Sequence, residues 1–132
     1  MTFIDAEHAA FFDKFCGEMK RSDEYHEAVA YLFALDRVCR EHIEDLFNFD
    51  EDCIVLEGLR KGWQTGTSVK TTRLAFNLWN GHCSDGQKGK DKDGYEVDLP
   101  SRYYAVDEIF CCSYAPYYWE AIKLRYPLYS GE

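Results

Sequence analysis

Apolar residues recur every three or four positions in the first fifty residues, where they form three separate stripes. This spacing places the apolar side chains on one face of an α-helix. The stripes occupy residues 8–19, 25–33 and 39–47. Each follows a polar residue suited to an N-cap: Asp5, then Ser22 or Asp23, then Asp36. The connections are short, so we expect neighbouring helices to pack against one another.

The middle of the chain is expected to contain a loop followed by a fourth helix. Residues 50–66 show no sustained period and hold three glycines, which is typical of a loop. A helical pattern resumes over about residues 68–80, with Thr67 or Ser68 as its N-cap. Gly81 stands just past the end of this pattern, where a glycine commonly terminates a helix.

The last third of the chain mixes a loop, a short strand and a helix. Residues 84–94 are polar and rich in glycine, which predicts an exposed flexible loop. Residues 95–99 alternate as a strand would, without an obvious partner, and residues 116–126 form a helix bounded by two prolines. The fold class is therefore mainly α. We expect a single compact helical domain over residues 1–132, with about five helices and one short strand or hairpin near residues 95–104.

Negative charge is concentrated in the first part of the chain. The formal net charge is -9, with 15 acidic and 5 basic residues in positions 1–57 against 9 acidic and 10 basic residues in positions 58–132. Such a surface repels nucleic-acid phosphates, which counts against direct binding of DNA or RNA. It suits a basic partner, although a solvated acidic face also keeps a protein soluble.

The sequence contains no motif for catalysis, a metal or a cofactor. The N-terminal segment lacks the features of a signal peptide and no segment is apolar enough for a membrane span, so we expect a cytoplasmic protein whose six cysteines are free thiols. The cysteines and histidines lack zinc-site spacing, and the acidic segment at residues 91–94 does not fit a calcium loop. No nucleophile elbow occurs, and we expect no enzyme activity.

A polar face on the fourth helix is the first candidate site. Lys70, Arg73 and Asn77 recur at helical spacing after a loop and helix start rich in hydroxyl groups. Free backbone N–H groups at such a start could hold an anion, although an exposed amphipathic helix shows the same polar face. The candidate anion- or ligand-binding set is Trp63, Gln64, Thr65, Ser68, Lys70, Arg73 and Asn77.

The acidic residues that follow Asp36 are the second candidate site. Spread over a helix and the next loop, their carboxylates could imitate a phosphate backbone and occupy the basic groove of a nucleic-acid enzyme. Most acidic helices do nothing of this kind. The candidate partner-binding set is Glu41, Glu44, Asp45, Asp50, Glu51 and Asp52.

Two segments of the chain resemble a known family. WQTGTSVKTTRLAFNLWNG and YAPYYWEAIKLRYP, residues 63–81 and 114–127, are similar to a domain of unknown function in small proteins of phages and conjugative elements of Firmicutes. The stretch from residue 24 to residue 54 resembles the first half of that family, so the resemblance covers most of the chain. The chain departs from the family in its lysine-rich residues 84–94 and in its cysteines. The resemblance implies a genetic context and no particular chemistry.

These observations lead to two hypotheses of function. The first is a non-enzymatic interaction protein that modulates or inhibits a host protein, such as a nucleic-acid-processing enzyme or a defence machine, through its acidic surface. The second is a binder of a phosphate-bearing small molecule, such as a nucleotide signal, at the segment from Trp63 to Arg73. With 10 tyrosines, 9 phenylalanines and 3 tryptophans the chain carries more aromatic residues than a core of this size buries, which leaves a homodimer open.

Overall fold

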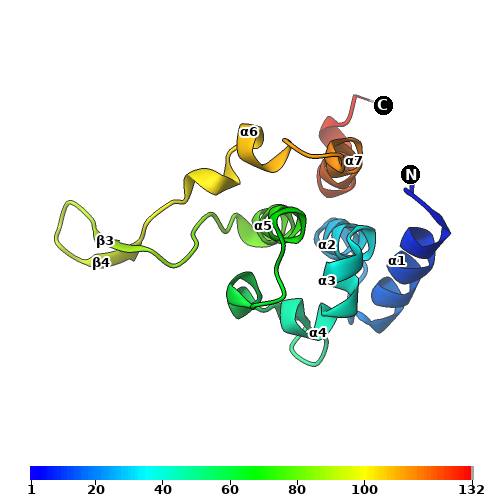
Figure 1. Ribbon diagram of the computed structural model, residues 1–132, viewed down its shortest axis with the longest axis horizontal. Coiled ribbons are helices and arrows are strands. Elements are labelled where there is room, and N and C mark those ends of the chain that lie inside the picture. Colours follow the sequence, from blue (N-terminus) through cyan, green and yellow to red (C-terminus); the bar gives the residue numbers. More distant parts are fainter. Residues whose placement is uncertain (132) are drawn as a thin grey trace.

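The computed structural model describes residues 1–131 and is mainly α-helical, as predicted (Figure 1). The helices in this part of the chain are α1 (Ala6–Glu18), α2 (Glu24–Leu35), α3 (Arg37–Glu41), α4 (Ile43–Leu46), α5 (Gly66–Asn80), α6 (Val106–Ile109) and α7 (Ala115–Arg125). The strands are β1 (Phe47–Asn48), β2 (Cys53–Ile54), β3 (Lys88–Lys90) and β4 (Glu96–Asp98). Three 3₁₀ turns complete the order: η1 (Leu56–Arg60), η2 (Arg102–Tyr104) and η3 (Pro127–Tyr129).

Helix α2 lies at the centre of the domain. It packs against α1, α5 and α7, and every residue from Ala28 to Leu35 is buried. We expected one apolar face on this helix, but its second half is buried on every side. A helix that has neighbours on all sides is apolar around its whole circumference. Tyr25, which the stripe included, is exposed, and the guanidinium of Arg125 lies 3.7 Å from its ring centroid.

Carboxylates begin the first helices at the predicted positions. Asp5 accepts a hydrogen bond from the backbone N–H of His8, and Asp23 accepts one from that of His26. Asp36 accepts a hydrogen bond from the backbone N–H of Cys39, although the carboxylate itself is buried. These bonds satisfy N–H groups that have no partner within the helix.

The predicted third helix is divided at His42, which raises the number of helices above the five expected. His42 has φ -120° and ψ 32°, outside helical geometry, so the chain turns between α3 and α4. Its imidazole stacks on the indole of Trp63, with the ring centroids 4.4 Å apart. Helix α6 is the other addition, and its four residues are too few to produce a periodic signal.

Helix α5 begins two residues earlier than predicted and ends where predicted. Thr65 is its N-cap, and the side chains of Thr65 and Ser68 each accept a hydrogen bond from the backbone N–H of the other residue. This reciprocal arrangement is a capping box. At the other end Gly81 has φ 79°, the left-handed conformation that glycine adopts without strain.

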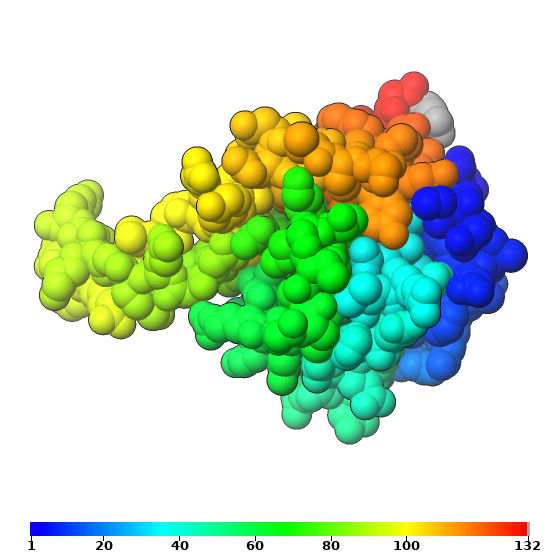
Figure 2. All heavy atoms as spheres, viewed as in Figure 1, coloured from blue at the N-terminus to red at the C-terminus, as the bar shows by residue number. Residues whose placement is uncertain are grey.

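A hairpin arm, which we define as residues 84–101, projects from the helical body (Figures 1 and 2). Strand β4 confirms the predicted strand, but its antiparallel partner β3 lies inside the segment predicted to be a flexible loop. Gly89 faces Val97 across the ladder, and a Cβ on Gly89 would lie 2.6 Å from a methyl carbon of Leu99. The absence of that Cβ lets Leu99 cover the strand.

The six cysteines are free thiols, as predicted. Cys39 is buried, whereas Cys16 is only partly buried. Across residues 1–131 the structure contains no helix with the length and apolar character needed to cross a membrane.

Candidate functional site

The acidic surface is the set of carboxylates at the end of the body formed by α3, α4 and the β1–β2 turn (Figure 1). Glu44 lines one shallow groove together with Glu41 and Asp45 and a second groove together with Asp50. Asp50 lines a third groove with Glu51 and Asp52. The grooves connect the six predicted acidic residues, which are Glu41, Glu44, Asp45, Asp50, Glu51 and Asp52. The same grooves are also lined by Lys14, Lys20, Arg21 and Arg40.

Asp52 differs from its neighbours because its carboxylate makes contacts with residues of other parts of the fold. Its Oδ2 atom lies 2.8 Å from His26 Nε2, and its Oδ1 atom accepts a hydrogen bond from the backbone N–H of Lys20 at 3.0 Å. The residue has φ 57°, a left-handed conformation that Asp tolerates better than most residues. These contacts attach the β1–β2 turn to α2.

His26 bridges two carboxylates at the base of this turn. Its Nδ1 atom lies 2.6 Å from Asp23 Oδ1, and its side chain is almost fully buried. Burial raises the pKa of Asp23, but the hydrogen bonds from the His26 side chain and backbone outweigh burial, so the net shift is downward.

Asp45 also has a structural role. Its Oδ2 atom accepts a hydrogen bond of 2.8 Å from the indole N–H of Trp63, while Lys61 Nζ lies 4.0 Å from its Oδ1 atom. Trp63 is partly buried against the core and stacked on His42. The tryptophan therefore covers the core and connects the loop before α5 to α4.

The remaining carboxylates of the acidic surface are exposed. Glu41 forms an ion pair of 3.0 Å with Arg37, and both side chains are largely in solvent. Glu44, Asp50 and Glu51 are exposed, and Asn48 Oδ1 accepts hydrogen bonds from the backbone N–H groups of the last two. The side chains of Asp50 and Glu51 are thus displayed on a turn whose backbone is fixed at both ends.

The hydroxyl groups at the start of α5 are used within the protein. Ser68 is buried, and its hydroxyl donates to Gln64 Oε1 at 2.6 Å. Gln64 Nε2 donates in turn to the Gly58 carbonyl and to Thr72 Oγ1. With the capping box of Thr65 and Ser68, these bonds account for the hydroxyl-rich sequence without a ligand.

The cations and the amide of the candidate anion-binding set also have partners inside the chain. Lys70 Nζ donates to the Cys111 carbonyl at 3.3 Å, and Asn77 Nδ2 donates to the His82 carbonyl at 3.1 Å. Arg73 forms two hydrogen bonds with Asp85, from Nε at 3.2 Å and from Nη2 at 3.1 Å. The structure lends this set no geometric support as a ligand site, and the anion-binding hypothesis stays a prediction.

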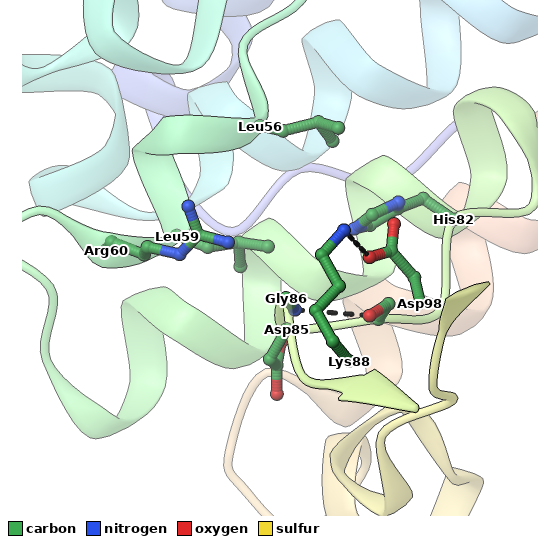
Figure 3. A pocket seen from close by; sticks show the side chains of 9 residues that line it. Leu56, Leu59, Arg60, His82, Asp85, Gly86, Lys88 and Asp98 are labelled. Atoms are coloured by element: carbon green, nitrogen blue, oxygen red, sulfur yellow. Dashed lines mark hydrogen bonds and ion pairs between the residues drawn. The ribbon is translucent and has the colours of Figure 1, made fainter. Parts of the chain in front are cut away.

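The arm pocket, a cavity of about 110 Å³ beneath the base of the hairpin arm, was missed by the sequence reasoning (Figure 3). Arg60, His82 and Lys88 reach it from η1, from the segment after α5 and from β3. No motif joins these positions in the sequence, because they meet only where the base of the arm lies beside η1. The other lining residues are Leu56, Leu59, Ser84, Asp85, Gly86 and Asp98.

Within residues 1–131, no group of three or more His, Cys, Asp or Glu side chains is placed to hold a metal ion. In the comparisons with known proteins, no curated protein and no solved structure matches the chain. The chain does match a protein family along its whole length, residues 1–132, and that family is described as a family of unknown function, DUF6075. The protein therefore belongs to the DUF6075 family.

Proposed function

We propose that this protein is a non-enzymatic interaction protein that binds a basic partner protein through the acidic surface. The partner class is a host nucleic-acid-processing or defence protein, whose phosphate-binding groove accepts carboxylates in place of phosphates. The setting is the cytoplasm of a bacterium that carries a phage or another mobile element, which is the context implied by the family resemblance.

The observation that carries the proposal is the attachment of the β1–β2 turn to α2 through Asp52 and His26. Because the turn is held at a buried contact, Asp50 and Glu51 project from a fixed backbone beside Glu44. Because the backbone of the turn is already ordered, association avoids the entropy cost of fixing it.

The proposal is tested by reversing only the exposed charges. The quadruple variant Glu41→Lys, Glu44→Lys, Asp50→Lys and Glu51→Lys leaves Asp45 and Asp52 in their structural contacts. Tagged wild-type and variant proteins are incubated with lysate of a Firmicutes bacterium, and the captured proteins are quantified by mass spectrometry. We expect the wild type to enrich basic nucleic-acid-binding proteins, with capture that weakens as salt is added.

A matched control carries the same change in net charge at exposed acids elsewhere: Asp13→Lys, Glu18→Lys, Asp93→Lys and Asp107→Lys. Thermal unfolding checks that both variants fold. The proposal holds if capture is lost in the surface variant and kept in the control. It is refuted if the two variants capture the same proteins to the same extent, or if the wild type enriches no basic protein.

The alternative, binding of a nucleotide signal near Trp63 and Arg73, has a separate readout. Nucleotides added to the wild type would raise its melting temperature if they bind the folded protein. Lys70→Ala would remove that increase under the alternative and would leave partner capture unchanged under the main proposal.

A further inference from the structure

Three basic side chains from distant parts of the sequence converge on the arm pocket (Figure 3). Arg60 is the last residue of η1, His82 follows the end of α5, and Lys88 begins β3. Leu56 and Leu59 line the same cavity. The pocket is distinct from the acidic surface, with which it shares no residue.

The carboxylates of this pocket already have cationic partners. Asp85 receives two hydrogen bonds from Arg73 and a third from the Ser101 hydroxyl at 2.7 Å. Asp98 forms an ion pair with Lys88, with Nζ and Oδ1 2.5 Å apart. The ammonium of Lys88 has three N–H donors, so two remain free after this contact. The hydrogen bond to Asp98 and the charge of that carboxylate raise the pKa of Lys88, which keeps the ammonium protonated.

Arg60 is the cation of the pocket that has no carboxylate partner among residues 1–131. Its guanidinium has no hydrogen bond or ion pair with any other side chain or backbone group of residues 1–131. Asp85 and Asp98 are neutralised by Arg73 and Lys88, so Arg60 leaves a net positive charge at the cavity. Arg60 is exposed, and an unpaired guanidinium at the mouth of a cavity attracts an anion.

Gly86 lets this guanidinium lie against the arm. The residue has φ +95°, and a Cβ built on it would lie 2.0 Å from Arg60 Nη2. A side chain at this position would therefore displace the guanidinium from the cavity. Glycine serves both requirements, since it adopts the left-handed conformation and leaves the space free.

Ser84 supplies a further donor. The residue is buried, with 6% of its surface exposed, and its Oγ atom accepts a hydrogen bond of 3.1 Å from the backbone N–H of Gly86. Its own hydroxyl hydrogen has no acceptor among the other side chains and carbonyls of residues 1–131. A buried hydroxyl that lines a cavity and has a free hydrogen is suited to a ligand that can accept it.

We propose that the arm pocket binds a phosphoryl group through Arg60, Lys88, Ser84 and His82. The cavity of about 110 Å³ is large enough to hold several waters. A cavity of this size has room for one tetrahedral oxyanion. The lining thus combines two cations with a hydroxyl and an imidazole, groups that can donate hydrogen bonds to the oxygens of an oxyanion.

The experiment titrates the intact protein with inorganic phosphate and, separately, with adenosine monophosphate, at matched chloride concentration and ionic strength. Isothermal titration calorimetry gives the affinity, and ¹H–¹⁵N NMR follows the backbone amide of Gly86. We expect both ligands to shift the Gly86 amide. If the nucleotide binds more tightly than inorganic phosphate, the ligand class is an organic phosphate ester. If the two affinities are equal, the ligand is free phosphate.

The test variant is Arg60→Gln, and the matched control is Arg102→Gln, an exposed arginine that does not line the cavity. Losing a charged hydrogen-bond donor is expected to weaken phosphate binding by about tenfold or more. Ser84→Ala is a second variant that keeps all the charges and should weaken binding to a smaller extent. Circular dichroism and thermal unfolding confirm that each variant is folded.

The proposal is overturned if millimolar phosphate neither binds nor shifts the Gly86 amide in the wild type. It is equally overturned if Arg60→Gln and Ser84→Ala both bind phosphate as the wild type does, or if Arg102→Gln loses binding to the same extent as Arg60→Gln. In these last cases any bound phosphate would lie elsewhere on the surface.

Discussion

His26 Nε2 and Asp52 Oδ2 lie 2.8 Å apart and join the central helix α2 to a turn 26 residues further along the chain. Both side chains are mostly shielded from solvent, with exposed fractions of 6% and 11%. The contact fixes the left-handed conformation of Asp52 and, with it, the position of the neighbouring acidic residues. The acidic surface therefore depends on a buried contact of its least exposed member.

Replacing Asp52 by alanine is expected to lower the free energy of unfolding by about 2–4 kcal/mol. The substitution removes the acceptor for His26 and for the Lys20 backbone N–H, and it places a residue with a Cβ and no polar side chain in a left-handed conformation. Urea unfolding measures the change. Asp50→Ala on the same turn removes an equal charge from an exposed position and should change stability by no more than about 0.5 kcal/mol. Equal losses in the two variants would show that the contact with His26 does not hold the turn.

Stability is expected to fall as the pH decreases through the range in which His8 titrates. Burial lowers the pKa of His8 from 6.5, and its Nε2 atom lies 2.9 Å from the Tyr31 carbonyl. Just below pH 6.5 the unfolded chain binds a proton at this residue and the folded protein does not, so protonation favours unfolding. The contribution of His8 is complete above pH 6.5 and is lost as the pH decreases.

Urea midpoints measured between about pH 7.5 and about pH 5 test this prediction. His8→Gln keeps a polar side chain that does not titrate, so its stability should decrease less over the same range. The pKa of Asp23 is lowered from 3.8, so the contribution of Asp23 to stability is lost only below this pH range. It therefore does not affect the comparison. Parallel pH profiles for wild type and His8→Gln would contradict the prediction.

Two glycine substitutions are expected to have opposite effects. A Cβ on Gly58 would lie 2.6 Å from the Asp45 carbonyl oxygen and 2.7 Å from a methyl carbon of Leu46, so Gly58→Ala should destabilise the protein by about 1–3 kcal/mol. A Cβ on Gly17 in α1 would meet nothing within 4 Å, and Gly17→Ala should stabilise the helix by up to about 1 kcal/mol. Melting temperatures measure both changes. A rise for Gly58→Ala would mean that η1 is not packed closely on α4.

The hairpin arm is expected to loosen when Arg73 is replaced by lysine. Lysine cannot reproduce the two hydrogen bonds to Asp85, and it loses the planar group that lies 5.0 Å from the ring centroid of Tyr103. Amide hydrogen exchange followed by mass spectrometry should become faster in residues 84–101 and remain unchanged in α2. Lys123→Gln, which removes an exposed contact with Glu120, is the control and should leave the exchange of the arm unaltered. Unchanged exchange in Arg73→Lys would show that the arm is held elsewhere.

Local patterns were sufficient to predict most of the helices. The carboxylates of Asp5, Asp23 and Asp36 cap helices at the expected positions, and Gly81 ends α5 in the left-handed conformation. Each of these signals acts over three or four residues, so it is legible in the sequence. The break at His42 could not be predicted in this way, because it accompanies a stack with Trp63, which is 21 positions away in the sequence.

The candidate sites were predictable to different degrees. The charges of the acidic surface are visible in the sequence, but the division between exposed carboxylates and the structural Asp45 and Asp52 is not. That division depends on contacts with Trp63 and His26, which lie in other elements. The same limit applies to the arm pocket, whose Arg60 and Lys88 are 28 positions apart.

By itself, the amino-acid sequence determined the helical character of this protein, most of the ends of its longer helices and the excess of negative charge in its first part. These properties follow from capping, periodicity and composition, which act between near neighbours or on the whole chain at once. Only the tertiary structure decided which polar side chains are used to hold the fold, which remain at the surface and which enclose a cavity. Those roles depend on contacts between residues far apart in the sequence, and such contacts exist only when the chain has folded.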